Sequence, residues 1–149
     1  MSSVVHGSFT VSRSWKASPE QVFAAFATQE GKRKWFGGPG MELLEKSFDF
    51  REGGRETARG KHPNGMASSF DCIYRDIVPN ARIVYSYVMH LDGKKISVSQ
   101  ACIELKPEGS GTKLTVTEYG DFLDGYDDAD SREHGTNFLM DQLGKSVGG

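Results

Sequence analysis

The stretch that decides the fold is Ser18-Pro19-Glu20-Gln21-Val22-Phe23-Ala24-Ala25-Phe26, and Lys34-Trp35-Phe36 follows shortly after it. Ser18 suits a helix N-cap, Pro19 suits the first helical position, and Gln21 can complete a capping box. The apolar residues of the stretch recur at helical spacing, so one face of this helix turns inward. A helix start is therefore followed directly by a cluster of aromatic residues.

Around this helix the chain has the alternating pattern of β-strands. A short second helix is expected from Thr28 to about Lys34. Strands are expected near residues 7–16, 41–50, 55–61, 68–78, 82–90, 95–106 and 112–119. The Asp92-Gly93 pair is a strong signal for a two-residue hairpin. Consecutive strands joined by short turns predict an antiparallel meander.

The end of the chain predicts a last helix after an acidic loop at residues 121–130. Asp130 and Glu133 have the spacing of a capping box, with Asp in place of Ser or Thr. The residues expected on or near the inner face of this helix are Phe138, Leu139, Gln142 and Leu143. The predicted class is therefore α+β, with an early helical region, an antiparallel sheet and a closing helix.

Composition narrows the class of protein. The 149 residues suit one domain spanning 1–149, and 37% hydrophobic with 26% charged residues is typical of a soluble globular chain. A net charge of -2 offers no basic stripe for nucleic acid. No apolar run reaches the ~20 residues of a membrane span, and the N-terminus lacks a signal-peptide pattern. We expect a cytoplasmic protein, with Cys72 and Cys102 reduced.

Motifs for metal binding and nucleophilic catalysis are missing from the sequence. The four histidines, His6, His62, His90 and His134, are scattered, and the acidic stretch at 121–130 lacks the alternating acids of a calcium loop. Cys72 has no identifiable histidine partner, and there is no Gly-x-Ser-x-Gly elbow. We expect no metal and no cofactor.

Several motifs spread over nearly the whole chain carry a family resemblance. They are Ala17-Ser18-Pro19-Glu20-Gln21-Val22-Phe23, Trp35-Phe36-Gly37, Asp49-Phe50-Arg51-Glu52-Gly53-Gly54, Ile77-Val78-Pro79-Asn80-Ala81-Arg82-Ile83-Val84, Gly111-Thr112-Lys113-Leu114-Thr115-Val116-Thr117, and Gly135 with Leu139 and Gln142-Leu143. The chain resembles the helix-grip (START / polyketide cyclase-like, SRPBCC) superfamily. Within it, the chain is most similar to the family related to the C-terminal domain of the activator of Hsp90 ATPase.

This resemblance implies a fold but no single activity. It implies a curved, seven-stranded antiparallel sheet around a long C-terminal helix, two short helices after the first strand, and an apolar cavity between sheet and helix. Members of the superfamily bind lipids, hormones and polyketides, and some are enzymes. Many relatives carry Trp after the glycine of the closing helix, where this chain has Thr136, so the size of the cavity stays open.

Aromatic residues are the main candidates for ligand binding. Each ring taken alone is ordinary core packing, but as a set they exceed what a one-layer sheet needs, which predicts an apolar pocket. Trp35, Phe36 and the loop at 37–40 are expected to form a lid. The candidate aromatic side chains are Trp35, Phe36, Phe48, Phe70, Tyr85, Tyr87, Phe122 and Phe138.

Two polar residues join these candidates. Glu118 shares a strand face with Leu114 and Val116. The pattern favours a solvated strand end, or an ion pair with Arg51 or Arg82. The alternative is an inward carboxyl of raised pKa that acts as a general acid or base. Gln100 shares a face with Ile96, Val98 and Cys102 and is a candidate to hydrogen-bond a ligand. His90 is expected at the surface.

Three functional hypotheses follow. The first is a non-enzymatic carrier or sensor of a small hydrophobic or aromatic molecule, oriented by Tyr85, Tyr87, Gln100 and Glu118. The second is a cyclase- or dehydratase-like enzyme that uses Glu118 or a tyrosine. The third, an Hsp90-type chaperone partner, ranks last because the co-chaperone carries an additional N-terminal domain that this chain lacks. Apolar positions near the lid leave a homodimer open.

Overall fold

The computed structural model describes residues 2–37 and 40–149. Its elements in chain order are β1 (Val4–Trp15), α1 (Pro19–Ala27), α2 (Gln29–Arg33), β2 (Glu42–Phe48), β3 (Arg55–Lys61), β4 (Ala67–Val78), β5 (Arg82–Leu91), β6 (Lys94–Glu108), β7 (Gly111–Leu123) and α3 (Ala129–Ser146). The strands form one antiparallel seven-stranded sheet in the order β1-β7-β6-β5-β4-β3-β2. The predicted helix-grip fold is confirmed.

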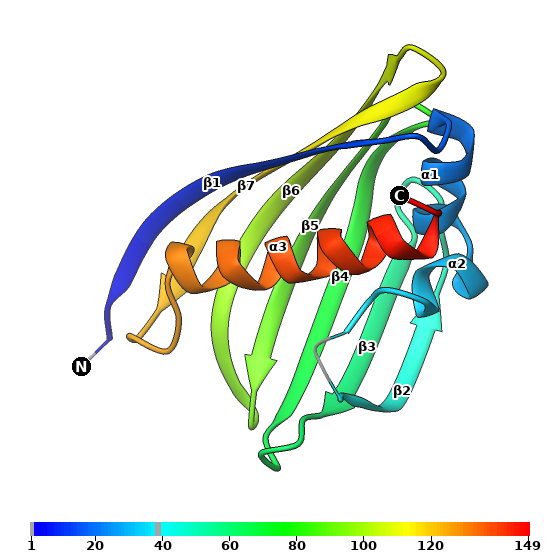
Figure 1. Cartoon of the computed structure of the whole chain (residues 1–149). Coiled ribbons are helices and arrows are strands. Elements are labelled where there is room, and N and C mark those ends of the chain that lie inside the picture. The colour runs from blue at the N-terminus through cyan, green and yellow to red at the C-terminus, as the bar shows by residue number, and fades with distance from the viewer. Residues whose placement is uncertain (1, 38–39) are drawn as a thin grey trace.

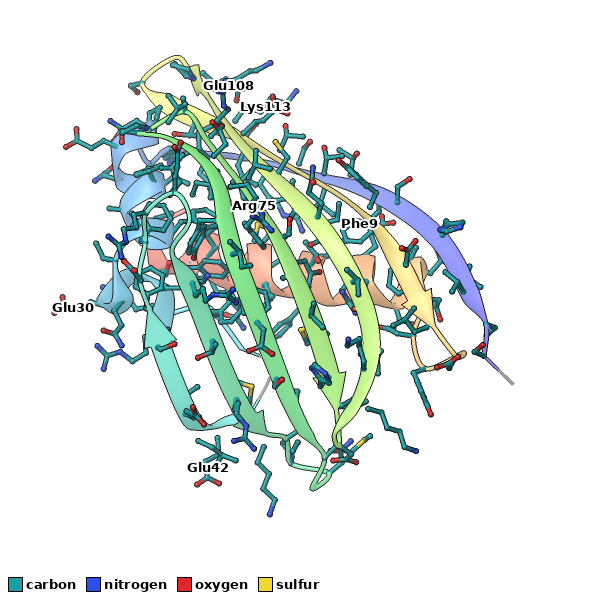
Figure 2. The ribbon with its side chains drawn as sticks, turned by 180° about the vertical axis from the view of Figure 1, so that it is seen from behind. Phe9, Glu30, Glu42, Arg75, Glu108 and Lys113 are labelled. Atoms are coloured by element: carbon teal, nitrogen blue, oxygen red, sulfur yellow. The ribbon has the colours of Figure 1, made fainter. Side chains whose placement is uncertain are left out.

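The sheet curves around α3, which crosses its concave face, while α1 and α2 lie at one end near the C-terminus (Figure 1). The core fills the space between these layers. Figure 2 shows the molecule from behind, with the opposite face of the sheet toward the viewer and the exposed Arg75 over it. No helix within residues 2–37 and 40–149 combines the length and the hydropathy that a membrane span requires.

The C-terminal half of α3 is fixed to β1. Arg13 on β1 donates to Asp141 Oδ1 (3.1 Å) and to Asn137 Oδ1 (2.9 Å) of the helix. Gly144 lies so close to the indole of Trp15 that a Cβ would stand 2.7 Å from its Nε1, and only glycine allows that approach. The start of α3 also lies against β1, since a Cβ on Gly7 would stand 2.7 Å from the Cβ of Ala129. Between these two points, residues of the helix line the space above the sheet.

The helix cap and the hairpin turn that were predicted from neighbouring residues are both present. Gln21 N–H donates to Ser18 Oγ (3.2 Å) and Ser18 N–H donates to Gln21 Oε1 (2.9 Å), which is the expected capping box. Asp92 and Gly93 both have positive φ angles of 50° and 79°, as a type I′ hairpin turn between β5 and β6 requires.

The predicted start of the last helix was wrong. Strand β7 continues to Leu123 because its residues from Tyr119 onward still pair with both β1 and β6. The N-cap of α3 is Asp128, whose carboxylate accepts from the Ser131 N–H (2.8 Å), and not Asp130 with Glu133. The buried residues of the helix are Thr136, Met140, Leu143 and Gly144. Of the residues predicted on or near its inner face, Leu143 is buried, and Phe138 and Leu139 line the space between the helix and the sheet.

A β-bulge corrects the prediction for Gln100. The pairing of β5 with β6 shifts between Met89 and His90, so Ile96 has no partner and both Ile96 and Ser97 are buried. From Ser97 onward the odd-numbered residues of β6 face the interior, so Gln100 lies on the outer face of the sheet. There its side-chain amide donates to the hydroxyl of the exposed Tyr119 (2.5 Å). Gln100 therefore does not face the interior with Ile96.

Candidate functional site

A cavity of about 450 Å³ lies between the concave face of the sheet and the N-terminal half of α3. The segment after α2 contributes Phe36, Gly37 and Met41, and the sheet contributes mainly apolar side chains from β3, β4 and β5. The lining includes Phe36, Phe70, Tyr87, Glu118, Arg132, Thr136 and Phe138, with His62, Ser68, Ser131 and His134 at the rim. The fixed half of α3 and the curvature of the sheet together produce this space.

Five of the predicted site residues line the cavity: Phe36, Phe70, Tyr87, Glu118 and Phe138. Tyr87 is buried on β5 between the half-buried Ser86 and Val88, and Phe70 pairs with Met89 on the adjacent strand. Of the predicted lid, residues 38 and 39 lie outside the described residues, while Gly37 is part of the lining.

The other predicted aromatic residues pack behind the cavity wall. Trp35 donates its Nε1–H to the Ala25 carbonyl (2.9 Å) and packs edge-on against Phe26. Phe48 packs against Phe50 and Tyr74. Tyr85 lies between Tyr74 and Tyr87, and Phe122 lies under the guanidinium of Arg132. These four side chains support the wall and are not part of its surface.

The polar centre of the cavity is Glu118, which is 6% exposed. Its Oε1 accepts the hydroxyl hydrogen of Tyr87, and the Tyr87 oxygen accepts from Arg132 Nη1 (2.8 Å). The register places these groups together, because Tyr87 and Glu118 lie opposite Ser99 and Ala101 on the strand between them. Glu118 is thus an inward carboxyl.

The interpretation of Glu118 as a solvated strand end or an ion-pair partner was wrong. Arg51 is paired with Asp49 (2.9 Å) and Arg82 with Asp76 (2.5 Å), both at the surface. Glu118 ends inside because β7 continues for five residues beyond it and keeps its inner face covered by α3.

Burial and hydrogen bonding act in opposite directions on these groups. Burial raises the pKa of Glu118 above the ordinary value of 4.5, and the hydrogen bond from Tyr87 and the charge of Arg132 limit that rise. Burial, and then the negative charge of Glu118, raise the pKa of the Tyr87 hydroxyl, which therefore stays protonated and donates. The arrangement holds a carboxyl that exchanges its proton at a higher pH than a solvated one.

Arg132 belongs to the polar cluster of the cavity, and the sequence did not reveal it. Its Nη2 donates to Ser97 Oγ (2.8 Å) and to Asp127 Oδ2 (2.7 Å), and its guanidinium carbon lies 5.7 Å from the Tyr87 ring centroid. Ser97 turns inward only because of the bulge at Ile96. The available signal was a lone arginine shortly after the acidic run, in the first turns of the last helix, and by itself it indicates no site.

The sequence and the fold can be compared with those of known proteins. Residues 16–148 match the model of the family described as Activator of Hsp90 ATPase homolog 1-like protein. The chain belongs to this family. The resemblance predicted from the motifs is therefore confirmed, and the fold is that of proteins with a ligand-binding cavity in general.

Three solved structures are similar to this chain over nearly its whole length. The Mll3558 protein from Rhizobium loti is 43% identical with a TM-score of 0.89, over 97% of this chain and 99% of that one. A putative uncharacterized protein from Rhizobium leguminosarum is 38% identical with a TM-score of 0.93, over 99% and 97% of the two chains. Protein CV1439 from Chromobacterium violaceum, at 24% identity and a TM-score of 0.80 over 94% and 96% of the chains, shows the fold alone. No curated protein matches the sequence.

Thr136 is the residue at which this Hsp90-activator-like chain departs from the resemblance. Its side chain lies in the cavity lining and is 7% exposed. The resemblance places a Trp at this position in many relatives, and such a ring would enter the space that is open here. The small side chain therefore accounts for part of the cavity volume.

A second buried polar cluster lies behind the aromatic wall. Lys32 Nζ is 2.5 Å from Glu56 Oε1, which also accepts the Tyr74 hydroxyl hydrogen. The ammonium lies 4.5 Å from the Phe36 ring centroid and 5.5 Å from that of Phe70. The cluster anchors α2, and with it Phe36, to β3 and β4. A polar strand around residues 55–61 was the one feature of this cluster that could be predicted.

The histidines are dispersed as the sequence indicated. His6 contacts Asp121 (2.6 Å), His62 and Ser68 share a hydrogen bond (2.8 Å), and His90 is part-exposed, 3.9 Å from Asp71. Within the part of the chain that the structure describes, no three His, Cys, Asp or Glu residues gather as metal ligands.

Proposed function

We propose that this protein binds a small, mainly apolar or aromatic molecule in the cavity between the sheet and α3, as a carrier or sensor. A volume of about 450 Å³ falls within the roughly 300–1,000 Å³ of small-molecule sites. Such sites combine an apolar lining with a few convergent polar groups, and here Glu118 and Tyr87 are those groups.

The coincidence of an apolar cavity with one buried carboxyl on its wall carries the proposal. Burial of apolar ligand surface would supply most of the affinity, at about 25 cal/mol per Å² before the costs of association. The Glu118 carboxyl would fix the orientation of the ligand, because a buried polar group that finds its partner favours one pose over others.

Native mass spectrometry tests this proposal first. A mass excess on the folded protein that disappears on denaturation would report a co-purified ligand and give its mass. In parallel, N-phenyl-naphthylamine, a neutral dye that becomes fluorescent in apolar sites, would be titrated into the wild-type protein. Binding of a ligand or of the dye supports the proposal, and the absence of both contradicts it.

A matched pair of variants locates the binding site. Thr136→Trp should fill the cavity and abolish both dye binding and the mass excess, since the new ring projects into the lining. Thr10→Trp introduces the same ring at an exposed position of β1 and should leave binding unchanged. Equal binding in the two variants would place the ligand elsewhere.

A second candidate function is an enzyme of the cyclase or dehydratase kind. The observation that favours it is the raised pKa of Glu118 beside a protonated Tyr87, because such a carboxyl suits general acid–base catalysis. Glu118→Gln should then abolish turnover of a substrate and preserve its binding. Retained turnover would remove Glu118 from the mechanism. The family's description names an Hsp90 activator, but the described residues add nothing specific to a chaperone partner, and we propose none.

A further inference from the structure

When Glu118 is ionised, the charges at the polar wall of the cavity are not balanced. Two carboxyl groups, Glu118 and Asp127, meet one cation, Arg132. Arg132 contacts Asp127 directly at 2.7 Å but reaches Glu118 only through the Tyr87 hydroxyl. The nearest other buried cation, Lys32, is paired with Glu56 at 2.5 Å. The wall therefore has one carboxyl more than it has cations.

Hydrogen bonding at Glu118 is also incomplete. Tyr87 donates to Oε1, and no described residue donates to Oε2. Glu118 is part of the cavity lining, and Oε2 is not among the fully enclosed atoms that lack a partner. This oxygen is the atom of Glu118 that is left to meet a ligand, and an oxygen of a carboxylate accepts hydrogen bonds.

The other polar groups around the cavity do not offer a ligand the same buried, charge-bearing acceptor as Glu118. His62 and Ser68 hydrogen-bond each other, and Ser131 and His134 are exposed at the rim. Thr136 offers a neutral hydroxyl. Within residues 2–37 and 40–149, Glu118 is thus the buried charge-bearing group of the lining that lacks a direct partner of opposite charge.

On these observations we infer that the ligand is an amine. It would have an aromatic or aliphatic body and a protonated amino group whose N–H donates a hydrogen bond to Glu118 Oε2. This inference rests on the proposed function, since it names the ligand class of the same cavity. An ammonium group would balance the extra carboxyl and satisfy its free oxygen. A carboxylate or sulfonate would instead bring a second negative charge against Glu118 inside a largely apolar space.

Four naphthalene probes with the same aromatic body separate these chemistries. They are naphthylethylamine, naphthylethanol, naphthylacetone and naphthylacetate, titrated into the purified full chain by isothermal titration calorimetry. The amine should bind about tenfold or more tightly than the alcohol, as a charge-assisted hydrogen bond in a buried site implies. The acetate should bind most weakly.

Two variants test the role of the carboxyl. Glu118→Gln keeps the shape of the side chain and should reduce amine binding to the level of the alcohol, which itself should change by no more than about twofold. Glu108→Gln is the matched control, because Glu108 is exposed at the end of β6, at the β6–β7 hairpin in Figure 2. It should keep the full preference for the amine.

The pH profile of the wild-type protein gives a reading that needs no substitution. The charged and titratable groups around Glu118 are Tyr87, Tyr85, Arg132 and Asp127, with His62 and His134 at the rim. Amine affinity should rise with pH as Glu118 loses its proton, because the ionised carboxylate attracts the ammonium. Affinity for a ketone would fall, since only the protonated carboxyl can donate to its carbonyl.

The outcomes distinguish this inference from the proposed function. If the alcohol binds but the amine has no advantage, or the ketone or acetate binds more tightly, the amine assignment is overturned and a ligand-binding cavity stands. The same follows if Glu118→Gln, shown to be folded by circular dichroism, keeps the preference. If none of the four probes binds, the amine assignment is overturned, and the proposed function is then decided by the mass excess and the dye titration.

Discussion

Replacing Lys32 by methionine should destabilise the fold by about 3–5 kcal/mol, the usual cost of removing one partner of a buried ion pair. Lys32 is 4% exposed and Glu56 is fully buried, so little solvent reaches either charge. Methionine can occupy the space along the Phe36 ring that the lysine stem occupies now. The loss would therefore come mainly from leaving the Glu56 carboxylate with Tyr74 as its one partner.

Urea unfolding followed by tryptophan fluorescence and by circular dichroism measures this loss. Lys34→Met serves as the control, since Lys34 is exposed and its replacement should stay within about 0.5 kcal/mol. The double variant Lys32→Met with Glu56→Gln should be more stable than Lys32→Met alone, because no uncompensated charge is left. A loss below about 1 kcal/mol for Lys32→Met, or additive losses in the double variant, would refute the reasoning.

Three other predictions concern single groups. Burial raises the pKa of Glu118 in the folded state above its unfolded value, so its contribution to stability is present below about pH 4.5 and is lost as pH rises through the folded pKa. Urea titrations from about pH 4.5 to about pH 8 should therefore show the wild type losing stability relative to Glu118→Gln. Parallel curves of stability against pH for the two proteins would contradict this. Removing the N-cap of α3 by Asp128→Ala should cost about 1 kcal/mol in thermal unfolding, whereas Asp130→Ala should cost less. Burial raises the pKa of Cys72 to about 12, so Ellman's reagent should label half-exposed Cys102 first and Cys72 only on unfolding; rapid labelling of two thiols in the folded protein would count against this.

The fold could be predicted because its signals are local. A capping box involves residues three apart, a hairpin turn involves two, and alternation within a strand involves neighbours. Ser18 with Gln21, and Asp92 with Gly93, each specify their geometry without knowledge of the rest of the chain. Once seven strands and a final helix are recognised, sequential antiparallel pairing leaves few other arrangements.

The site could be predicted only in part because it depends on register between distant elements. A single bulge at Ile96 turns Ser97 inward and Gln100 outward, and alternation alone cannot reveal such a shift. Arg132 reaches Tyr87 across 45 residues of sequence. Its place also depends on where α3 begins, which differed from the prediction by two residues at the N-cap, Asp128 instead of Asp130.

The concave face of the sheet contains the same hydrogen-bond motif twice, and the comparison explains why only one copy is available to a ligand. Glu56 accepts the hydroxyl of Tyr74, as Glu118 accepts that of Tyr87. Lys32 lies 2.5 Å from Glu56 and compensates its charge directly, behind the rings that line the cavity. The cation beside Glu118 is compensated by a different carboxylate, and Glu118 itself lies in the lining. Both carboxyl groups, Glu56 and Glu118, are buried, so burial alone does not distinguish a binding site from a structural ion pair. The absence of a direct counterion on the cavity side distinguishes Glu118 from Glu56, and this difference is what supports our proposal of a cationic ligand.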